Sequence, residues 1–164
     1  MLVKDAAKQA AQSVLDSHWD GVFPVDPSRI AGRLGIHVQR ESLPEDTSGF
    51  IMKRKGEDAR IFIEAKDSAL RQNFTCAHEL GHYIERTEVQ KVPDEDFAFV
   101  DLRHARTHDV HEFFANEFAG NLLMPESEAR RLHNLPWDAI RMAAHFGVSI
   151  PAMKTRLVKL RLLT

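Results

Sequence analysis

The residues with the clearest chemical meaning are His78, Glu79 and His82, which form a His-Glu-x-x-His motif. Two histidines four residues apart lie on one face of an α-helix, so both imidazoles can bind the same metal ion. Such a pair typically holds Zn²⁺, and the glutamate beside the first histidine can act as a base on a water that the metal acidifies. The motif therefore indicates hydrolysis. The competing interpretation is a helix that carries two histidines for unrelated reasons.

A catalytic zinc site usually has three protein ligands and keeps one position for water, so a third ligand must come from elsewhere in the chain. Glu112 is our choice, because it lies in a predicted helix over 110–124 in which Asn116 follows one turn later on the same face. Asn116 could then hydrogen-bond the outer nitrogen of a zinc-bound histidine. Three histidines remain alternatives to Glu112 as the ligand: His104, His108 and His111.

The motif lies in a predicted helix over 68–86, which must present both histidines to the metal. The buried side of this helix should include Leu70 and Phe74, and Gly81 would let another backbone come close. Cys76 lies roughly 200° round the helix from His78, so it should face away from the ion and be buried as a small apolar residue.

Further helices and a small sheet are expected around this helix. Apolar spacing predicts a first helix over 3–17, and Asp26 followed by Pro27 predicts the start of a second. Three strands are expected, at 36–40, 48–53 and 60–64, with the last two forming a hairpin. One of the hairpin strands, as an edge strand, could align an extended peptide by main-chain pairing. Residues 97–100 could be a short strand or an apolar flap beside the site.

Length and composition indicate an ordinary globular protein with a real hydrophobic core. The chain has 164 residues, of which 43% are hydrophobic and 28% charged, and its net charge of −2 gives no general reason to expect nucleic acid as a partner. Cys76 is the only cysteine, which excludes an intrachain disulfide and fits a reducing compartment. Without a signal-peptide pattern or an apolar run long enough to span a bilayer, a cytoplasmic location and no membrane contact are expected.

The C-terminal segment should be helical. Helices are predicted over 127–133 and 137–146, and Ser149 can cap a third, so that the last two resemble a helix-turn-helix. We therefore divide the chain into a domain over 1–125 and a helical segment over 126–164 that packs on it. DNA binding is possible but packing is favoured, because the basic patch on the last helix is modest: Lys154, Arg156, Lys159 and Arg161.

Together these motifs resemble the ImmA/IrrE family of bacterial and phage-borne metallopeptidases, over nearly the whole length. The resemblance rests on four stretches: 24–36, 48–50, 71–83, which contains the His-Glu-x-x-His motif, and 112–125, which contains Glu112, Ala115-Asn116 and Leu122-Leu123-Met124-Pro125. It implies a zincin-like α+β fold, here with a small three-stranded sheet packed on the metal-binding helix. It also implies zinc held by His78, His82 and Glu112, with Glu79 as the base.

Two functions follow as hypotheses. The first, which the resemblance implies, is a zinc-dependent endopeptidase that cleaves a helix-turn-helix repressor and so induces the genes that the repressor silenced. The second is a non-proteolytic regulator or interaction module that binds DNA or a repressor through the same scaffold. The complete set of His78, Glu79 and His82 favours the first.

Overall fold

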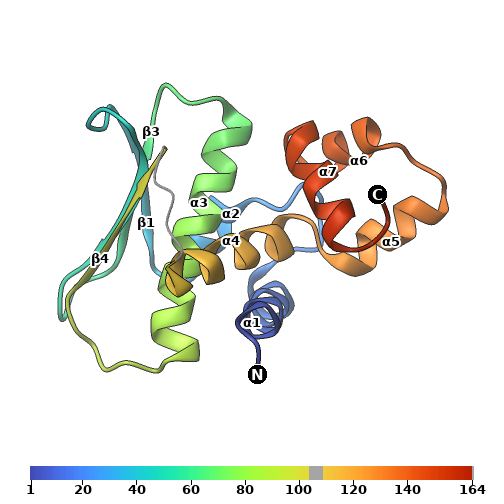
Figure 1. The fold of residues 1–164 in the computed structure, drawn as a ribbon. Helices are drawn as coiled ribbons and strands as arrows, with labels where there is room; N and C mark the ends of the chain where they lie inside the picture. Colours follow the sequence, from blue (N-terminus) through green and yellow to red (C-terminus); the bar gives the residue numbers. More distant parts are fainter. Residues whose placement is uncertain (104–108, 164) are drawn as a thin grey trace.

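The computed structural model describes residues 1–103 and 109–163 and shows a mixed α+β fold (Figure 1). In these residues the helices are α1 (Val3–His18), α2 (Pro27–Arg33), α3 (Ala69–Ile84), α4 (Val110–Leu123), α5 (Glu126–Asn134), α6 (Ala139–Phe146) and α7 (Ile150–Lys159). The strands are β1 (His37–Glu41), β2 (Thr47–Lys53), β3 (Arg60–Glu64) and β4 (Phe97–Leu102), and a π-helical turn, η1 (Glu85–Val89), follows α3. The α+β class predicted from the sequence is confirmed.

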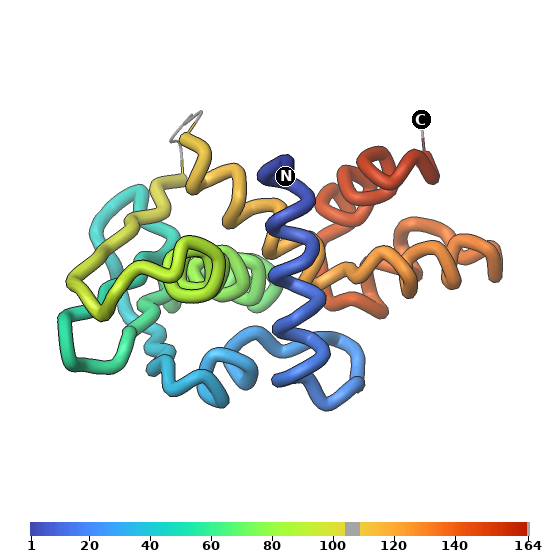
Figure 2. Tube along the Cα trace, turned by 90° about the horizontal axis from the view of Figure 1, so that it is seen from below, coloured from blue at the N-terminus to red at the C-terminus, as the bar shows by residue number. Residues whose placement is uncertain are grey.

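The elements form layers on both sides of a central pair of helices. The sheet lies against one side of α3, and α4 packs on another (Figure 1). Helix α1 packs against α4 and lies, in the view from below, between the sheet and the C-terminal helices α5–α7 (Figure 2). The two central helices are therefore enclosed, which explains why so much of α3 is buried.

The sheet has four strands among the described residues, in the order β1-β3-β2-β4. The predicted hairpin of β2 and β3 is confirmed, and β1 pairs with β3 in parallel. The expected count of three strands is wrong, because Phe97–Leu102 pairs antiparallel with β2. The two hairpin strands consequently lie inside the sheet, and β1 and β4 form its edges.

Helix α3 begins where the sequence indicates, with the Ser68 hydroxyl accepting a hydrogen bond of 3.2 Å from the backbone N–H of Arg71. Leu70 was expected on the buried side but is 43% exposed, because it lies in the first turn, before the helix passes under its neighbours. The prediction for Gly81 is confirmed: a Cβ there would lie 3.0 Å from Cα of Ala115 on α4. The missing side chain lets the two central helices approach closely.

The C-terminal helices follow the predicted order. Helix α6 ends at Gly147, which has a φ of +65°, and the Ser149 hydroxyl caps α7 by accepting from the backbone N–H of Ala152 at 3.2 Å. The expectation that Arg156 lies on a basic surface is wrong. Arg156 is only 6% exposed and donates to the carbonyl of Met124 and to Oδ1 of Asn121, both at 3.0 Å. Burial lowers the pKa of Arg156.

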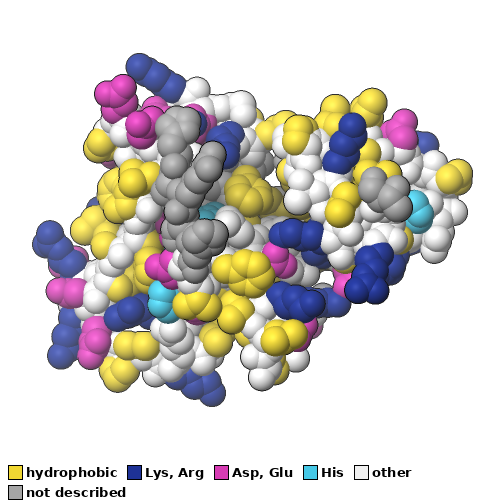
Figure 3. Space-filling model, in the orientation of Figure 1, with side chains coloured by type: hydrophobic (Ala, Val, Ile, Leu, Met, Phe, Trp, Pro, Cys, Tyr) yellow, Lys and Arg dark blue, Asp and Glu magenta, His cyan; other side chains and the backbone are white. Residues whose placement is uncertain are grey.

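Other basic side chains of this region are paired with acidic ones. Lys159 on α7 forms an ion pair with Glu117 on α4, and Lys8 on α1 pairs with Glu126 on α5. Blue and magenta side chains accordingly lie next to each other on this face of the molecule (Figure 3).

The division of the chain after residue 125 stays a prediction. Within the described residues, no helix has both the length and the apolar character that crossing a bilayer requires.

Candidate metal centre

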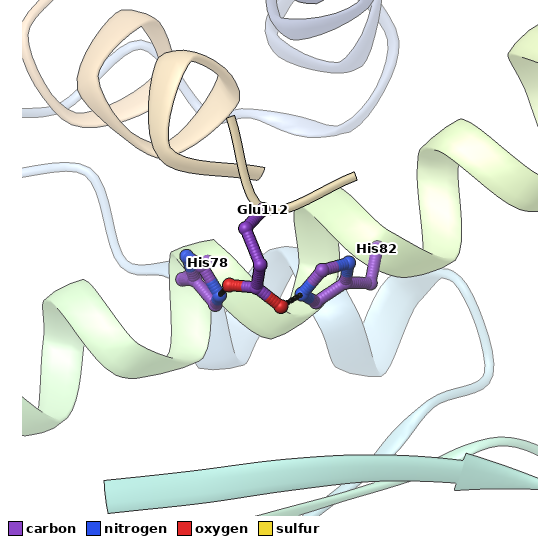
Figure 4. Close-up of side chains that lie close together, drawn as sticks. All are labelled: His78, His82 and Glu112. Atoms are coloured by element: carbon purple, nitrogen blue, oxygen red, sulfur yellow. Dashed lines mark ion pairs between the residues drawn. The ribbon is translucent and has the colours of Figure 1, made fainter. Parts of the chain in front are cut away.

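Three side chains from α3 and α4 converge at one point (Figure 4). Nε2 of His78 lies 3.0 Å from Oε2 of Glu112, and Nε2 of His82 lies 3.1 Å from Oε1 of the same carboxylate. Both imidazoles are almost fully buried, whereas the Glu112 side chain is 20% exposed. The structure thus brings together the two motif histidines and the glutamate chosen from the sequence as the third ligand.

The donor atoms of this cluster fit a divalent metal ion. They all lie within 4.8 Å of one another. Ligand bonds of about 2.1 Å in a tetrahedral site separate neighbouring ligand atoms by about 3.4 Å, so only a small adjustment would admit an ion. Two imidazole nitrogens with one carboxylate are a donor set used by catalytic zinc sites. The chemistry of the donors therefore matches the metal predicted from the sequence.

The pKa shifts of Glu112 and His82 favour the protonation states that bind a cation. Burial opposes ionisation of Glu112, but the close contacts of its carboxylate with the imidazoles of His78 and His82 outweigh burial and hold the pKa of this carboxyl well below its usual range. Burial lowers the pKa of His82, which favours the neutral ring that a metal requires. The carboxylate is therefore charged and the imidazole free to donate a lone pair.

Asn116 lies one turn after Glu112 and contacts the first histidine. Its Oδ1 is 2.9 Å from Nδ1 of His78. An amide oxygen can only accept, so Nδ1 carries the proton and Nε2 keeps its lone pair directed at Glu112. Nδ1 of His82 is buried and has no hydrogen-bond partner in the described part of the chain. Among these residues, a polar neighbour therefore orients the ring through Nδ1 in His78 but not in His82.

Glu79 points from α3 towards the sheet rather than into the cluster of Glu112. Its side chain is fully buried, and neither carboxylate oxygen has a hydrogen-bond partner among residues 1–103 and 109–163. Gly49 on β2 makes room for it, since a Cβ there would lie 2.5 Å from Thr75 and 3.8 Å from Cγ of Glu79. Burial, and next the charge of Asp101, raise the pKa of Glu79 well above its usual range. A raised pKa favours the protonated form of this carboxyl, so that Glu79 can keep a proton once it has accepted one.

Two residues of β4 border the site: Phe99, in the stretch that the sequence left open between a strand and a flap beside the site, and Asp101, which the sequence did not single out. The ring of Phe99 stacks on that of His82, and the carboxylate of Asp101 lies within 4.8 Å of ligand atoms of His78 and Glu79. The period of two along a strand was the available signal, because it places Phe97, Phe99 and Asp101 on one face once this stretch is known to be a strand.

The structure does not bring the remaining candidates among the described residues into the cluster. Nδ1 of His111 is 3.0 Å from Oε1 of Glu85, so this histidine is engaged outside the cluster. His104 and His108 lie outside the described residues. Cys76 faces α2, with its Sγ 3.6 Å from Oγ of Ser28, and burial raises the pKa of its thiol to about 12. It packs as a small apolar residue, as predicted.

Comparison with known proteins gives one family. The model of Peptidase_M78, described as the IrrE N-terminal-like domain, matches residues 31–158. A solved structure of a Mycobacterium tuberculosis transcriptional regulator is similar, with a TM-score of 0.55 and 19% sequence identity. The similarity covers 94% of this chain but 46% of that one, so this chain spans less than half of its length. At this identity the likeness shows the fold alone. No curated protein matches the sequence.

Proposed function

We propose that this chain, which belongs to the Peptidase_M78 family of IrrE N-terminal-like domains, is a zinc-dependent endopeptidase. The family match over residues 31–158 confirms the resemblance to ImmA/IrrE proteins. The observation that carries the proposal is the convergence of His78, His82 and Glu112 beside a fully buried Glu79 without a hydrogen-bond partner among the described residues. A buried, unpaired carboxyl is costly to stability, so its presence here supports a chemical role.

His78, His82 and Glu112 would hold the metal, and Asn116 would fix the tautomer of His78. Bound zinc supplies Lewis acidity, which polarises a peptide carbonyl and makes a water a better nucleophile. Glu79 then takes the proton of the attacking water and passes it to the nitrogen of the leaving amine. The raised pKa of Glu79 suits both halves of this transfer, because the carboxyl can hold the proton between the two steps.

The substrate is proposed to be a protein, and specifically a helix-turn-helix repressor whose cleavage would induce gene expression. Two findings support a role in regulation: the family to which the chain belongs, and a fold shared with a protein described as a transcriptional regulator. The cytoplasmic location stays a prediction that fits such a substrate.

An extended substrate would pair with β4 rather than with the hairpin strands expected from the sequence. β4 is the edge strand on the side of the metal centre, and its Phe99 contacts His82. Main-chain pairing along this edge would bring a peptide past His78 and Glu79. The inner position of β2 and β3 leaves them without a free edge.

The decisive test compares the zinc-loaded protein with its Glu79→Gln form, incubated with the regulator encoded beside it. Fragments detected by mass should appear with the wild type only, while both proteins bind zinc equally. Glu88→Gln, which changes an exposed glutamate in the turn after α3, should cleave like the wild type. Cleavage that persists in Glu79→Gln would remove Glu79 from the proposal.

The alternative, a non-proteolytic module that binds DNA or a repressor, rests on the consecutive helices α6 and α7. Its DNA-binding form is weakened by the burial of Arg156 and by the pairing of Lys159 with Glu117. A gel-shift titration with double-stranded DNA decides it, since specific binding would weaken steeply with added salt. Failure of the wild type to cleave the regulator, together with stable binding to it, would favour the repressor-binding form.

A further inference from the structure

The acidic side chain of Asp101 is directed at the candidate catalytic centre by the pairing of β2 with β4. Asp101 lies opposite Gly49 in this antiparallel pair. Residues directly opposite each other project from the same face of a sheet. That face is the one against α3, because a Cβ on Gly49 would meet Thr75 and approach Glu79. The partial burial of Asp101, between exposed Val100 and exposed Leu102, agrees with this direction.

The surroundings of this carboxylate contain no described partner that neutralises it. Its oxygen lies within 4.8 Å of ligand atoms of His78 and Glu79. Arg71 acts on Asp101 through its charge, yet its guanidinium donates to Oγ of Ser48 at 3.2 Å instead. No ion pair or hydrogen bond of the Asp101 side chain is found in the described residues. Asp101 is thus a partly buried acid beside the reacting groups.

Asp101 is not placed to complete the metal ligands. The cluster within 4.8 Å that includes Asp101 contains His78 and Glu79, whereas His82 and Glu112 belong to the other cluster. The carboxylate therefore flanks the site on the side of Glu79. Asp101 adds a third acidic side chain to Glu79 and Glu112, and Arg71, whose charge acts on it, forms no described ion pair with it. Leaving such a charge partly buried is costly unless a cation joins it.

We propose that Asp101 is a specificity residue that binds a cationic group of the substrate, an ammonium or guanidinium, next to the bond to be cut. This inference rests on the proposed peptidase function. A peptide paired with the free edge of β4 would place the residue opposite Asp101 on the same face, towards α3 and the catalytic centre. A lysine or arginine side chain there, or the free amino terminus of a peptide, would form a charge-assisted hydrogen bond with the carboxylate.

Small metal-binding probes test this without turnover. Calorimetry would compare three hydroxamates on the zinc-loaded protein: Nα-acetyl-lysine hydroxamate, Nα-acetyl-norleucine hydroxamate and norleucine hydroxamate with its free amine. At least one of the two cationic probes should bind about tenfold more tightly than the uncharged one. A preference for the acetyl-lysine probe identifies a side-chain cation, and a preference for the free amine identifies an amino terminus.

Substitution of Asp101 separates its role from that of the ligands. Asp101→Asn should abolish the preference for the cationic probe, while its zinc affinity stays within about twofold of the wild type because Asp101 makes no described hydrogen bond that orients a metal ligand. Glu95→Gln, which removes an exposed charge shortly before β4, should leave both unchanged. Equal affinities for all three probes in the wild type would overturn the assignment, whether or not the protein cleaves the regulator. A tenfold loss of zinc affinity in Asp101→Asn with the preference intact would make Asp101 a metal ligand instead.

Discussion

The ring of Phe99 lies flat on the ring of His82, with centroids 4.3 Å apart and planes only 1° from parallel. This contact joins the edge strand β4 to the helix that carries both motif histidines. The position of one candidate metal ligand is therefore set by a residue of the sheet. The stacking also holds the His82 ring in place, although Nδ1 of His82 has no described hydrogen-bond partner that would do so.

Replacing Phe99 by alanine should weaken zinc binding about tenfold, because the His82 ring gains freedom that the metal must remove. The free energy of unfolding should fall by about 2 kcal/mol, less than for a fully buried phenylalanine. Zinc titration and urea unfolding would measure these effects. Val100→Ala, on the opposite face of the same strand and 55% exposed, should change neither by much. Unaltered zinc affinity in Phe99→Ala would show that the stacking does not position His82.

The motif residues were predictable because helical spacing is a local property. Four residues separate His78 from His82 and also Glu112 from Asn116, so each pair shares a face whatever the rest of the fold does. The structure brings these two faces together, and the two helices can approach closely because Gly81 has no side chain. Their role as ligands stays a prediction until a metal is measured.

The contributions of Phe99 and Asp101 could not be predicted in the same way. Both depend on β4 pairing with β2, and this pairing joins residues far apart in the sequence. A short apolar stretch fits a strand and a flap equally well until its partner is known. Arg156 shows the same limit, since its place in the sequence suggests a surface cation and only its contacts with Met124 and Asn121 reveal burial.

Removing the amide of Asn116 should loosen the first histidine. Asn116→Ala leaves Nδ1 of His78 without its acceptor at 2.9 Å, so zinc affinity should fall by about 10- to 100-fold. Asn116→Asp keeps an acceptor oxygen at the same place and should lose much less. Competition with a chromogenic chelator gives both values. Equal losses in the two variants would mean that the hydrogen bond to His78 has no part in metal binding.

Close packing of the central helices makes Gly81 sensitive to a single methyl group. In Gly81→Ala the new Cβ would lie 3.0 Å from Cα and 3.2 Å from the carbonyl oxygen of Ala115, which must move. We expect a loss of about 1–3 kcal/mol in stability, despite the better helix propensity of alanine. Zinc affinity should fall as well, because the shifted helix α4 carries Glu112.

Gly120 provides a matched control for Gly81 on the facing helix. A Cβ at Gly120 meets nothing within 4 Å, so Gly120→Ala should raise stability by up to about 1 kcal/mol through helix propensity alone. Thermal unfolding of the metal-free proteins separates packing from metal binding. If Gly81→Ala proved as stable as Gly120→Ala, the close approach of α3 and α4 would not be needed for the fold.

Acid should weaken the fold through Glu64 at the end of β3. Its carboxylate accepts from the backbone N–H groups of Leu43 at 2.8 Å and Lys66 at 3.1 Å, and these bonds, that of Leu43 first, lower the pKa of Glu64. A carboxyl with a lowered pKa in the folded state stabilises it above the unfolded value and loses this contribution as the pH falls through the folded value. Glu64→Gln should therefore be less stable than the wild type near pH 7, and the difference should shrink by about pH 3.5. Urea unfolding at pH 7 and at about pH 3.5 measures this difference in stability, and Glu57→Gln, which changes an exposed glutamate, is the control. A difference that stays constant with pH would show that the two backbone N–H groups do not stabilise the charged form of Glu64.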